Sequence, residues 1–526
     1  MLSILHLSLF FIASLVLYKF VPYVNTRYQN AAQAKKLGAE RVPTLPSPDP
    51  LGVGFVIRII KSNNAGKLLE YFQERLQIVS KQEGRPVLTF QTHILQSWLF
   101  FTCDPKNIQA LLATQFKDFS LGPIRFGTFS GLLGNGIFSV DGPKWEHARA
   151  LLRPQFARDQ VSDLELEERH LQNMLLALPV EADGWTKTID MLPINFRLTI
   201  DSASEFLFGE SVDTQLSILP GRSGSENDQA FVTAFETSQD LIAKAFRFND
   251  WYSIGLTKEY YEACKVCHQY IDRYVVKALS KNKENSLEQG EEKQHYIFLE
   301  ELARQTQDPI EIRDQLLSIL TAGRDTTASL LSFLWLVLSQ HPDVFDKLRS
   351  TVINEFGTYQ NPRNITFSSL KSCSYLQWCL NETLRLFPTV PINGRRSIKD
   401  TTLPRGGGPD GLSPIFIPKN TEVNYSVYCM HRNKELWGEN ADDFIPERWD
   451  GRKTGFDYLP FNGGPRICLG QQFALTEAGY IVVRLLQRFD KLDGSAMEGL
   501  DYDWNLTLTG RPKHGVNLRF HAADGN

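Results

Sequence analysis

The sequence lacks an excess of basic residues and a regular cysteine pattern, and each absence excludes a class of protein. Its 526 residues hold 56 Lys and Arg against 60 Asp and Glu, a net charge of −4, so electrostatics give no case for a nucleic-acid partner. The seven cysteines are odd in number and irregularly spaced, so they do not form a disulfide framework. Most of the chain is therefore expected in a reducing compartment.

Cofactor-binding motifs of the common kinds are missing as well. No flavin or iron–sulfur motif and no internal repeat occurs, and Gly52-Val-Gly54 lacks the third glycine of a dinucleotide loop. What the chain does have is an ordinary globular composition, with 42% hydrophobic and 22% charged residues. Its aromatic side chains are plentiful, with 34 Phe, 17 Tyr and 9 Trp, as a large core or an apolar pocket requires.

The N-terminal segment is apolar. Its first 18 residues contain no Asp, Glu, Lys or Arg, and this length is the lower limit for crossing a hydrocarbon core. Basic residues follow it at Lys19, Arg27, Lys35, Lys36 and Arg41. By the positive-inside rule, we expect residues 1–20 to form a transmembrane signal anchor, with the rest of the chain on the cytoplasmic side. An interfacial or buried helix is the alternative, because three serines dilute the apolar run.

Prolines mark the next segment. Those at positions 43, 46, 48 and 50 exclude a helix, so residues 21–50 are predicted to form a basic, proline-rich hinge that acts as a spacer. No later linker is strong enough to divide the chain, and residues 51–526 are therefore predicted to form one catalytic domain.

The fold class follows from the hydrophobic periodicity. Helical patterns dominate from Pro105 to Leu386, while alternating runs at residues 85–95 and 421–428 predict strands. Polar stretches at residues 221–229 and 281–295 predict surface loops. The chain is thus expected to be mainly α with a minor β portion.

The longest predicted helix opens at Asp308-Pro309 and runs to about Gln340, roughly 48 Å. Its middle is apolar apart from Arg324 and Asp325. A second transmembrane helix is the alternative interpretation, but an Arg-Asp pair at midspan would be costly in a bilayer. A helix through the centre of a large domain explains the pattern better.

The most specific feature is the segment Phe461-Asn-Gly-Gly-Pro-Arg-Ile-Cys-Leu-Gly470, which an apolar-periodic run follows. Its glycines and proline predict a tight irregular loop, and the run after it predicts a helix. Cys468 therefore lies just before a helix N-terminus, where backbone N–H groups and the helix dipole favour a thiolate. Such a thiolate is suited to be the axial ligand of haem iron. A buried free cysteine in a glycine-rich turn is the structural alternative, which the pattern F-x-x-G-x-R-x-C-x-G disfavours.

Other residues of this loop suit the same cofactor. Arg466 is placed to neutralise a haem propionate, and Phe461 can cover the sulfur. Gly464 and Gly470 allow the backbone to approach a porphyrin closely. On these residues the sequence resembles the cytochrome P-450 family, the haem-thiolate monooxygenases. The resemblance implies the P-450 fold and haem b (iron protoporphyrin IX), held without covalent links other than the bond from Cys468 to iron.

The middle of the long helix supports the resemblance. Ala322 and Gly323 remove side-chain bulk, so a flat cofactor can lie against the backbone there. Thr326 can bond to the carbonyl of Ala322, and an acid beside it, Asp325, can relay protons. In the family, the matching Asp-Thr pair serves oxygen activation. The alternative is that Asp325 merely pairs with Arg324.

A second group of residues matches a structural network of the family. Glu382 and Arg385 lie one helical turn apart, and Arg448 follows in the segment Phe-Ile-Pro-Glu-Arg-Trp. The family joins the corresponding residues behind the haem, so these three are expected to serve folding.

Further residues match propionate contacts of the family. Trp145 and Arg149 fit its W-x-x-x-R helix. Arg395 matches another propionate-binding position, and the adjacent Arg396 is the rival that the sequence leaves open.

Within the family, residues 134–161, 322–329 and 461–478 look like the fungal branch that hydroxylates n-alkanes and fatty acids. The resemblance implies a monooxygenase in the endoplasmic reticulum membrane that attacks a lipophilic chain, at or near its terminal carbon. Its partners would be dioxygen, NADPH–cytochrome P-450 reductase and, as a second electron donor, cytochrome b5. Apolar residues that suggest a greasy substrate site are Phe126, Phe129, Leu132, Leu133, Val390 and Ile392, although a structural core would look the same.

Three other functions stay open at this point. One is a monooxygenase of secondary metabolism, and another is a haem-thiolate isomerase or dehydratase that needs no reductase, which the Asp325-Thr326 pair disfavours. The third is a non-catalytic haem sensor or binder. The motif Cys264-Lys-Val-Cys-His268 matches the c-type haem attachment pattern, but it lies in a predicted amphipathic helix and is interpreted as coincidence.

Overall fold

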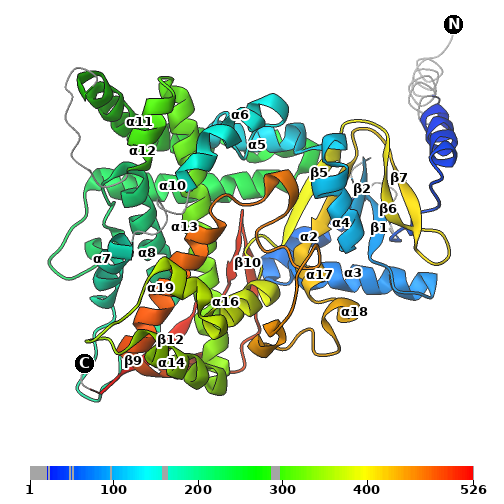
Figure 1. Ribbon diagram of the computed structural model, residues 1–526. Coiled ribbons are helices and arrows are strands. Elements are labelled where there is room, and N and C mark those ends of the chain that lie inside the picture. Colours follow the sequence, from blue (N-terminus) through cyan, green and yellow to red (C-terminus); the bar gives the residue numbers. More distant parts are fainter. Residues whose placement is uncertain are drawn as a thin grey trace, which may run out of the picture. The chain divides into compact units, whose positions relative to one another are not determined.

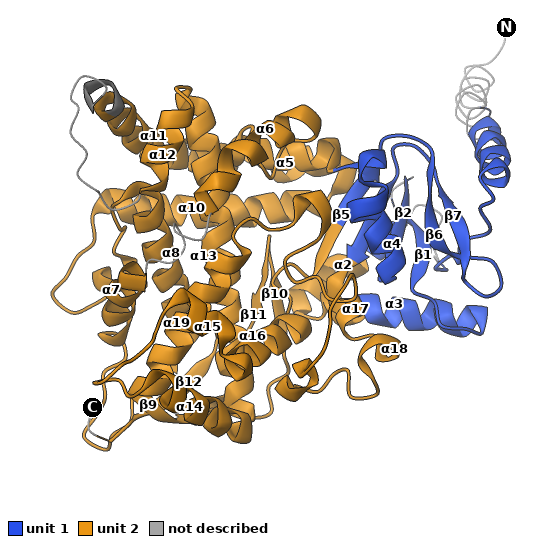
Figure 2. Cartoon of the chain, viewed as in Figure 1, with its two compact units in different colours: residues 1–56, 72–120, 394–425 blue, residues 57–71, 121–393, 426–526 orange. Residues whose placement is uncertain are grey.

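A computed structural model describes residues 21, 24–46, 49, 52–94, 97–156, 164–285 and 297–524 (Figure 1). The chain divides into two compact units (Figure 2). Unit 1 comprises residues 1–56, 72–120 and 394–425, and unit 2 comprises residues 57–71, 121–393 and 426–526. Each unit is therefore built from segments that are distant in the sequence.

Unit 2 is mainly helical. Its longer helices are α5 (Gly122–Leu133), α6 (Gly142–Leu152), α7 (Leu164–Leu175), α8 (Met191–Phe208), α10 (Glu226–Phe246), α11 (Lys258–Asn285), α12 (Phe298–Gln305), α13 (Pro309–Gln340), α14 (Pro342–Phe356), α16 (Ser374–Leu386) and α19 (Gln471–Arg488). Shorter ones are α9 (Thr214–Ser217), α15 (Phe367–Ser372), α17 (Val427–His431) and α18 (Lys434–Trp437). Its strands are β4 (Ile189–Asp190), β9 (Phe489–Asp493) and β12 (Asn517–Ala522) in one sheet, and β10 (Trp504–Leu506) and β11 (Gly510–Pro512) in another.

Helix α13 runs through the middle of unit 2, as the sequence predicts (Figure 1). The carboxylate of Asp308 caps it by accepting the N–H of Ile310 at 2.9 Å, and Pro309 occupies its first turn. Residues 327–338 are all buried, and the helix packs against α8, α11, α16 and α19. The apolar run is therefore explained by burial in protein. Among the described residues, no helix is long and apolar enough to cross a membrane.

Unit 1 contains the larger sheet, with strand order β1-β2-β8-β5-β3. Its strands are β1 (Thr89–Ile94), β2 (Ser97–Thr102), β3 (Phe119–Ser120), β5 (Ile392–Ser397) and β8 (Glu422–Ser426), and a separate pair is formed by β6 (Thr401–Gly407) and β7 (Ser413–Ile417). Strands β1 and β2 are antiparallel, whereas β2 and β8 are parallel. The two strands predicted from alternating runs, β1 and β8, are thus confirmed.

Helices α2 (Val53–Ala65), α3 (Leu68–Glu83) and α4 (Pro105–Gln109) complete the N-terminal part, and residues 24–36 are also helical. The predicted anchor over residues 1–20 lies outside the described residues.

The spacer predicted over residues 21–50 is wrong for its proline-containing part. Val42 and Leu45 are buried, and Leu45 donates its N–H to the carbonyl of Gln91 at 2.9 Å. The carbonyl of Pro43 in turn accepts the N–H of Gln91 at 2.9 Å. A proline lacks an N–H but keeps its carbonyl, so this segment can pair along the edge of β1 and belongs to the folded body of unit 1.

Both predicted polar loops are shorter than expected. Helix α10 begins at Glu226, inside the stretch 221–229, and α11 continues through Asn285, inside the stretch 281–295. Charged residues are compatible with exposed helical turns, so polarity alone placed these boundaries wrongly.

Candidate active site

The cysteine loop has the geometry that its glycines and proline predict. Gly464 has φ +66°, in the left-handed region that favours glycine, and a short 3₁₀ turn over Gly464–Arg466 follows. The N–H of Cys468 donates to the carbonyl of Phe461 at 3.0 Å, which closes the loop. Helix α19 begins at Gln471, so Cys468 lies three residues before it, as expected.

The thiol of Cys468 is accessible although protein atoms surround it. Of the seven cysteines, all free and all in the described part of the chain, only Cys468 is exposed. Burial nevertheless raises the pKa of its thiol, while the N–H of Gly470 and the charge of Arg149 lower that pKa. Cys468 is thus an exposed residue whose thiol is still partly desolvated by the surrounding protein. An accessible sulfur with a backbone donor and a nearby cation fits a thiolate ligand of haem iron.

Helix α6 supplies the groups beside this loop. Trp145 is buried, and the guanidinium carbon of Arg466 lies 4.4 Å from the centre of its ring. Arg149 donates from Nη1 to the carbonyl of Ile467 at 3.1 Å. The structure therefore brings Trp145, Arg149 and Arg466 together next to Cys468.

Arg466 has a partner that the sequence did not identify. Its Nη2 group forms an ion pair with Asp141 at 2.7 Å and donates to the carbonyl of Val140 at 2.9 Å. In the sequence, Asp141-Gly-Pro looks like the cap of α6, and nothing in it indicates a partner in the cysteine loop.

A strip of α13 is accessible in the middle of an otherwise buried helix. Ile319, Ala322, Gly323 and Thr326 are half-buried and share one helical face by their spacing. The hydroxyl of Thr326 donates to the carbonyl of Ala322 at 2.8 Å, the bond that the sequence predicts. These four residues form the accessible part of an otherwise buried stretch of α13, where a flat cofactor could lie against the helix backbone.

Two details of this strip differ from the expectation. A side chain at Gly323 would meet only the Cβ atom of Ala203 on α8, at 3.9 Å, so this glycine borders α8. Ile319 was missed because an isoleucine in an apolar helix carries no local signal of an accessible face.

Asp325 is buried, unlike the residues of the accessible strip. Its Oδ1 atom lies 3.4 Å from Nη1 of Arg324 without a hydrogen-bond partner among the described residues. Arg324 also pairs with Glu236 of α10. Burial raises the pKa of Asp325, an effect that the charges of Arg324 and Arg511 reduce. The Arg324 pairing weighed as an alternative is therefore present, through the same oxygen that lacks a hydrogen bond among the described residues.

A second buried acid was not predicted from the sequence. Glu477 on α19 accepts a hydrogen bond from the hydroxyl of Ser202 on α8 at 2.5 Å. Burial raises its pKa to about 7, although hydrogen bonds from Ser202 and Thr327 oppose the shift. The available signal was an acidic residue on the apolar face of the run after Cys468.

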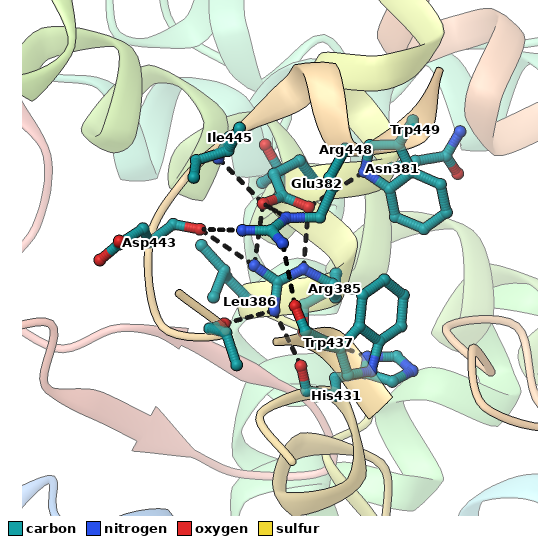
Figure 3. A network of polar contacts seen from close by, with 12 residues as sticks. Asn381, Glu382, Arg385, Leu386, His431, Trp437, Asp443, Ile445, Arg448 and Trp449 are labelled. Atoms are coloured by element: carbon teal, nitrogen blue, oxygen red, sulfur yellow. Dashed lines mark hydrogen bonds and ion pairs between the residues drawn. The ribbon is translucent and has the colours of Figure 1, made fainter. Parts of the chain in front are cut away.

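The residues of the expected structural network lie together (Figure 3). Arg385 forms a two-point ion pair with Glu382, with both N–O distances 2.8 Å, and the two side chains are fully buried. Arg448 donates to Glu382 at 2.7 Å, and the indole of Trp449 donates to it at 3.0 Å. The guanidinium of Arg385 also donates to the carbonyl of His431 at 2.8 Å. Glu382 is thus saturated by donors from two segments, while the folding role itself remains a prediction.

The two rival arginines lie on β5 in unit 1. Arg396 forms an ion pair with Glu422 at 3.3 Å, whereas Arg395 donates to the carbonyl of Gly394 at 2.7 Å and lies 5.8 Å from the ring centre of Tyr425. The choice between them as a propionate partner stays a prediction.

The apolar candidates for a substrate site have different environments. Leu132 and Leu133 are fully buried and Phe129 is nearly so, as expected of core residues. Val390 and Ile392 are half-buried, and Phe126 is exposed.

The C-x-x-C-H motif on α11 is structural. Cys264 and Cys267 are buried, and burial raises the pKa of the Cys264 thiol to about 12. Nε2 of His268 lies 2.8 Å from the carbonyl oxygen of Leu132. Within the described ranges, no group of three or more His, Cys, Asp or Glu side chains is arranged to hold a metal ion.

Comparisons with known proteins agree with this arrangement. A family model described as "Cytochrome P450" matches residues 64–514. "Cytochrome P450 monooxygenase g430" of Fusarium sp. is 47% identical over 97% of this chain and 89% of that protein. "Cytochrome P450 52A13" of Debaryomyces hansenii is 47% identical over 83% of each chain. The solved structure "Crystal structure of cytochrome P450DA heme domain" superposes with a TM-score of 0.74 over 92% of this chain and 98% of its own, at 20% identity, and so shows the fold alone.

Proposed function

The chain belongs to the cytochrome P-450 family, and from this premise we propose that it inserts one oxygen atom of dioxygen into C–H bonds of n-alkanes and fatty acids, at or near the terminal carbon. As a family member it is a monooxygenase with a cysteine-ligated haem b, a redox partner and hydrophobic substrates. The observation that carries the substrate class is its 47% identity to the 52A13 protein, within its resemblance to the fungal n-alkane and fatty-acid hydroxylases.

Terminal attack needs a physical explanation, because a primary C–H bond is stronger than its secondary neighbours. Selectivity must then come from an apolar channel that admits the chain end first and holds the methyl group in place. The half-buried Ile319, Val390 and Ile392 support such a lining. An apolar channel distinguishes one methylene by only about 1–3 kcal/mol, so we expect a range of chain lengths to be accepted.

We assign the cofactor contacts as follows. Cys468 would hold the iron, and when bound the haem supplies the centre at which dioxygen is activated. Arg149 and Arg466, close to the sulfur, would neutralise propionates together with the Trp145 indole. Arg395 is a further propionate candidate. Ala322, Phe461 and Gly470 would border the ring.

Thr326 and Asp325 are assigned to proton delivery. The hydroxyl of Thr326 lies on the accessible strip, and its bond to the Ala322 carbonyl orients it. The Oδ1 atom of Asp325 has its ion pair with Arg324 at 3.4 Å but no hydrogen bond in the described structure, so a water can bind there. Since burial raises its pKa, the carboxyl holds a proton more readily than an exposed aspartate would.

An electron donor would approach next to the cysteine loop. A cavity of about 640 Å³ lies there, lined by Lys371, Trp378, Arg452, Phe456, Gly463 and Ile467 among others. The proposed donors are NADPH–cytochrome P-450 reductase and cytochrome b5, because the chain has no flavin or iron–sulfur motif of its own.

We place the protein in the endoplasmic reticulum membrane, with a single span over residues 1–20 and the catalytic domain in the cytoplasm. Phe246, Trp251 and Ile254, exposed by 37%, 60% and 65%, would add peripheral contact with the bilayer.

Product identification tests the function. Reactions with purified enzyme, reductase and NADPH should convert alkanes and fatty acids of about twelve to eighteen carbons to terminal alcohols, detected by mass spectrometry. Mid-chain products would keep the substrate class but contradict the channel. Absence of any oxygenated product would favour a monooxygenase of secondary metabolism, and conversion of hydroperoxides without reductase would favour an isomerase or dehydratase.

The iron ligand is tested separately. Cys468→Ser should abolish the thiolate-type Soret band of the reduced carbonyl complex, because the serine oxygen is a poorer donor than a thiolate. Cys429→Ser is the matched control, since Cys429 is buried elsewhere in unit 2 and should leave the band in place. A surviving band in Cys468→Ser would contradict the assignment.

A further inference from the structure

Asp141 stands at a helix start but does not cap that helix. It occupies the position before α6, yet its carboxylate accepts no capping hydrogen bond from α6. Its two oxygens instead accept the N–H of Leu121, both at 2.9 Å, and one of them accepts the N–H of Gly122 at 3.2 Å. Asp141 therefore holds the beginning of α5, a helix that precedes it in the chain.

The same carboxylate also holds Arg466. The Asp141 Oδ1 atom accepts from Nη2 of Arg466 at 2.7 Å, and that Nη2 also donates to the carbonyl of Val140. The guanidinium lies over the ring of Trp145, and its side chain is only 10% exposed. Charge-assisted hydrogen bonds of this length in a partly buried setting are about twice as strong as neutral ones.

We propose that Asp141 is a positioning residue for the cofactor, which orients Arg466 and offsets its positive charge while tying the cysteine loop to the start of α5. This inference rests on the proposed function, because Arg466 lies two residues before the proposed iron ligand. Asp141 touches neither substrate nor iron in this assignment and acts only through Arg466.

The charge of Asp141 should affect the reduction potential of the cofactor. With Asp141 present, the Asp141–Arg466 pair is close to neutral. If the carboxylate is replaced by an amide, one negative charge is lost beside the cofactor, and Arg466 keeps only the proposed propionate as its counter-charge. A nearby positive charge favours the reduced state, which carries one more electron, so the reduction potential should rise.

Conservative variants separate this role from a structural one. In Asp141→Asn the side-chain oxygen can still accept the N–H groups of Leu121 and Gly122, so the start of α5 keeps its partner but Arg466 loses the charge of the Asp141 carboxylate. Asp141→Glu restores the charge. Glu146→Gln, an exposed position on α6, is the matched control for removal of one negative charge from the same helix.

The experiment is a spectroelectrochemical titration of each haem-loaded full-length protein in the same detergent. We expect the midpoint potential to rise in Asp141→Asn, to return toward the wild-type value in Asp141→Glu and to stay unchanged in Glu146→Gln. The shift should become smaller when Asp141→Asn is made in an Arg466→Gln background, because the part of the shift that acts through the position of the Arg466 guanidinium is then absent.

Equal potentials in Asp141→Asn and wild type would overturn the inference. If Asp141→Asn fails to retain haem, retention by Asp141→Glu would support the charge argument. Loss in both would show that Asp141 serves only the folding of α5. A wild-type protein without a thiolate-type carbonyl spectrum would overturn the proposed function itself, which the potentials alone would not.

Discussion

Cys468, Thr326 and Glu477 show how one residue's chemistry depends on neighbours from other elements. The thiol of Cys468 is accessible, whereas the other six cysteines are buried. Thr326 lies on an accessible strip, while Glu477 is enclosed between α8, α13 and α19. Local sequence indicated the first two because each belongs to a specific motif. It could not indicate that Glu477 keeps a raised pKa, which depends on burial.

At Thr326, replacement by alanine should leave haem binding intact and divert electrons from product formation to peroxide. The variant removes the hydroxyl that donates to Ala322 without enlarging a buried cavity, since the residue faces accessible space. Positioned proton transfer contributes roughly 10²–10⁴-fold, so product formed per NADPH consumed should fall by about tenfold or more. Thr321→Ala is the control, because Thr321 makes the same kind of bond to the carbonyl of Leu317 five residues earlier on the helix. An unchanged ratio in Thr326→Ala would refute the role.

At Glu477, the raised pKa predicts a pH-dependent stability. The folded protein binds this proton up to about pH 7, whereas the unfolded chain loses it near its ordinary value of 4.5. The carboxyl therefore makes its full contribution to the stability of the fold below pH 4.5, and that contribution is lost as the pH rises toward about 7. The free energy of unfolding of Glu477→Gln, compared with that of wild type, should therefore increase with pH over this range. The increase should be up to about 1.4 kcal/mol per pH unit.

Urea unfolding between pH 5 and 8 would measure this difference. The exposed Glu498→Gln serves as the control that should run parallel to wild type. A constant offset between Glu477→Gln and wild type across this range would contradict a buried, titrating carboxyl.

Between elements, buried polar contacts decide how segments join. Glu382 of α16 binds Arg385 on its own helix and Arg448 of the turn Pro446–Trp449 (Figure 3). The i,i+3 spacing suggested the first contact, but Arg448 and the carbonyl of His431 come from distant segments. The family resemblance, and not the spacing, predicted that these residues act together.

Breaking this network should destabilise the fold rather than alter the chemistry. Glu382→Ala leaves Arg385 fully buried without its counter-charge, so the free energy of unfolding should fall by about 3–5 kcal/mol. Glu301→Ala, which removes a partly exposed Glu–Arg pair at i,i+3 on α12, should cost at most about 1 kcal/mol. Denaturant unfolding followed by haem absorbance measures both. A loss near that of Glu301→Ala would mean that the network contributes little to stability.

On the scale of the whole molecule, the chain forms two compact units from interleaved segments. The sequence predicted one domain because no linker interrupts it. Contacts between residues far apart in the chain, such as those of residues 42–46 with β1, set where the folded body begins.

Truncations test where the anchor ends and the body starts. Deletion of residues 1–23 should move part or all of the protein from membranes to the soluble fraction with its haem content unchanged. Deletion of residues 1–46 removes the buried Val42 and Leu45, each worth about 1.5–3 kcal/mol, and should lower the melting temperature as well. If the shorter deletion stayed wholly membrane-bound after a carbonate wash, the anchor assignment would be wrong.

The sequence by itself determined the family, the cysteine loop, the long central helix and the Thr326 bond, because each depends on residues within a few turns of one another. Glycine and proline determine which backbone dihedral angles are available at their own positions, and in any helix the spacing brings residues i and i+4 together. Only the tertiary structure decided that Asp141 partners Arg466, that Glu477 is enclosed, that Ile319 is accessible and that residues 42–46 pair with β1. Such contacts join residues whose separation along the chain carries no information about their distance in the fold, so burial and partner choice emerge only when the elements pack.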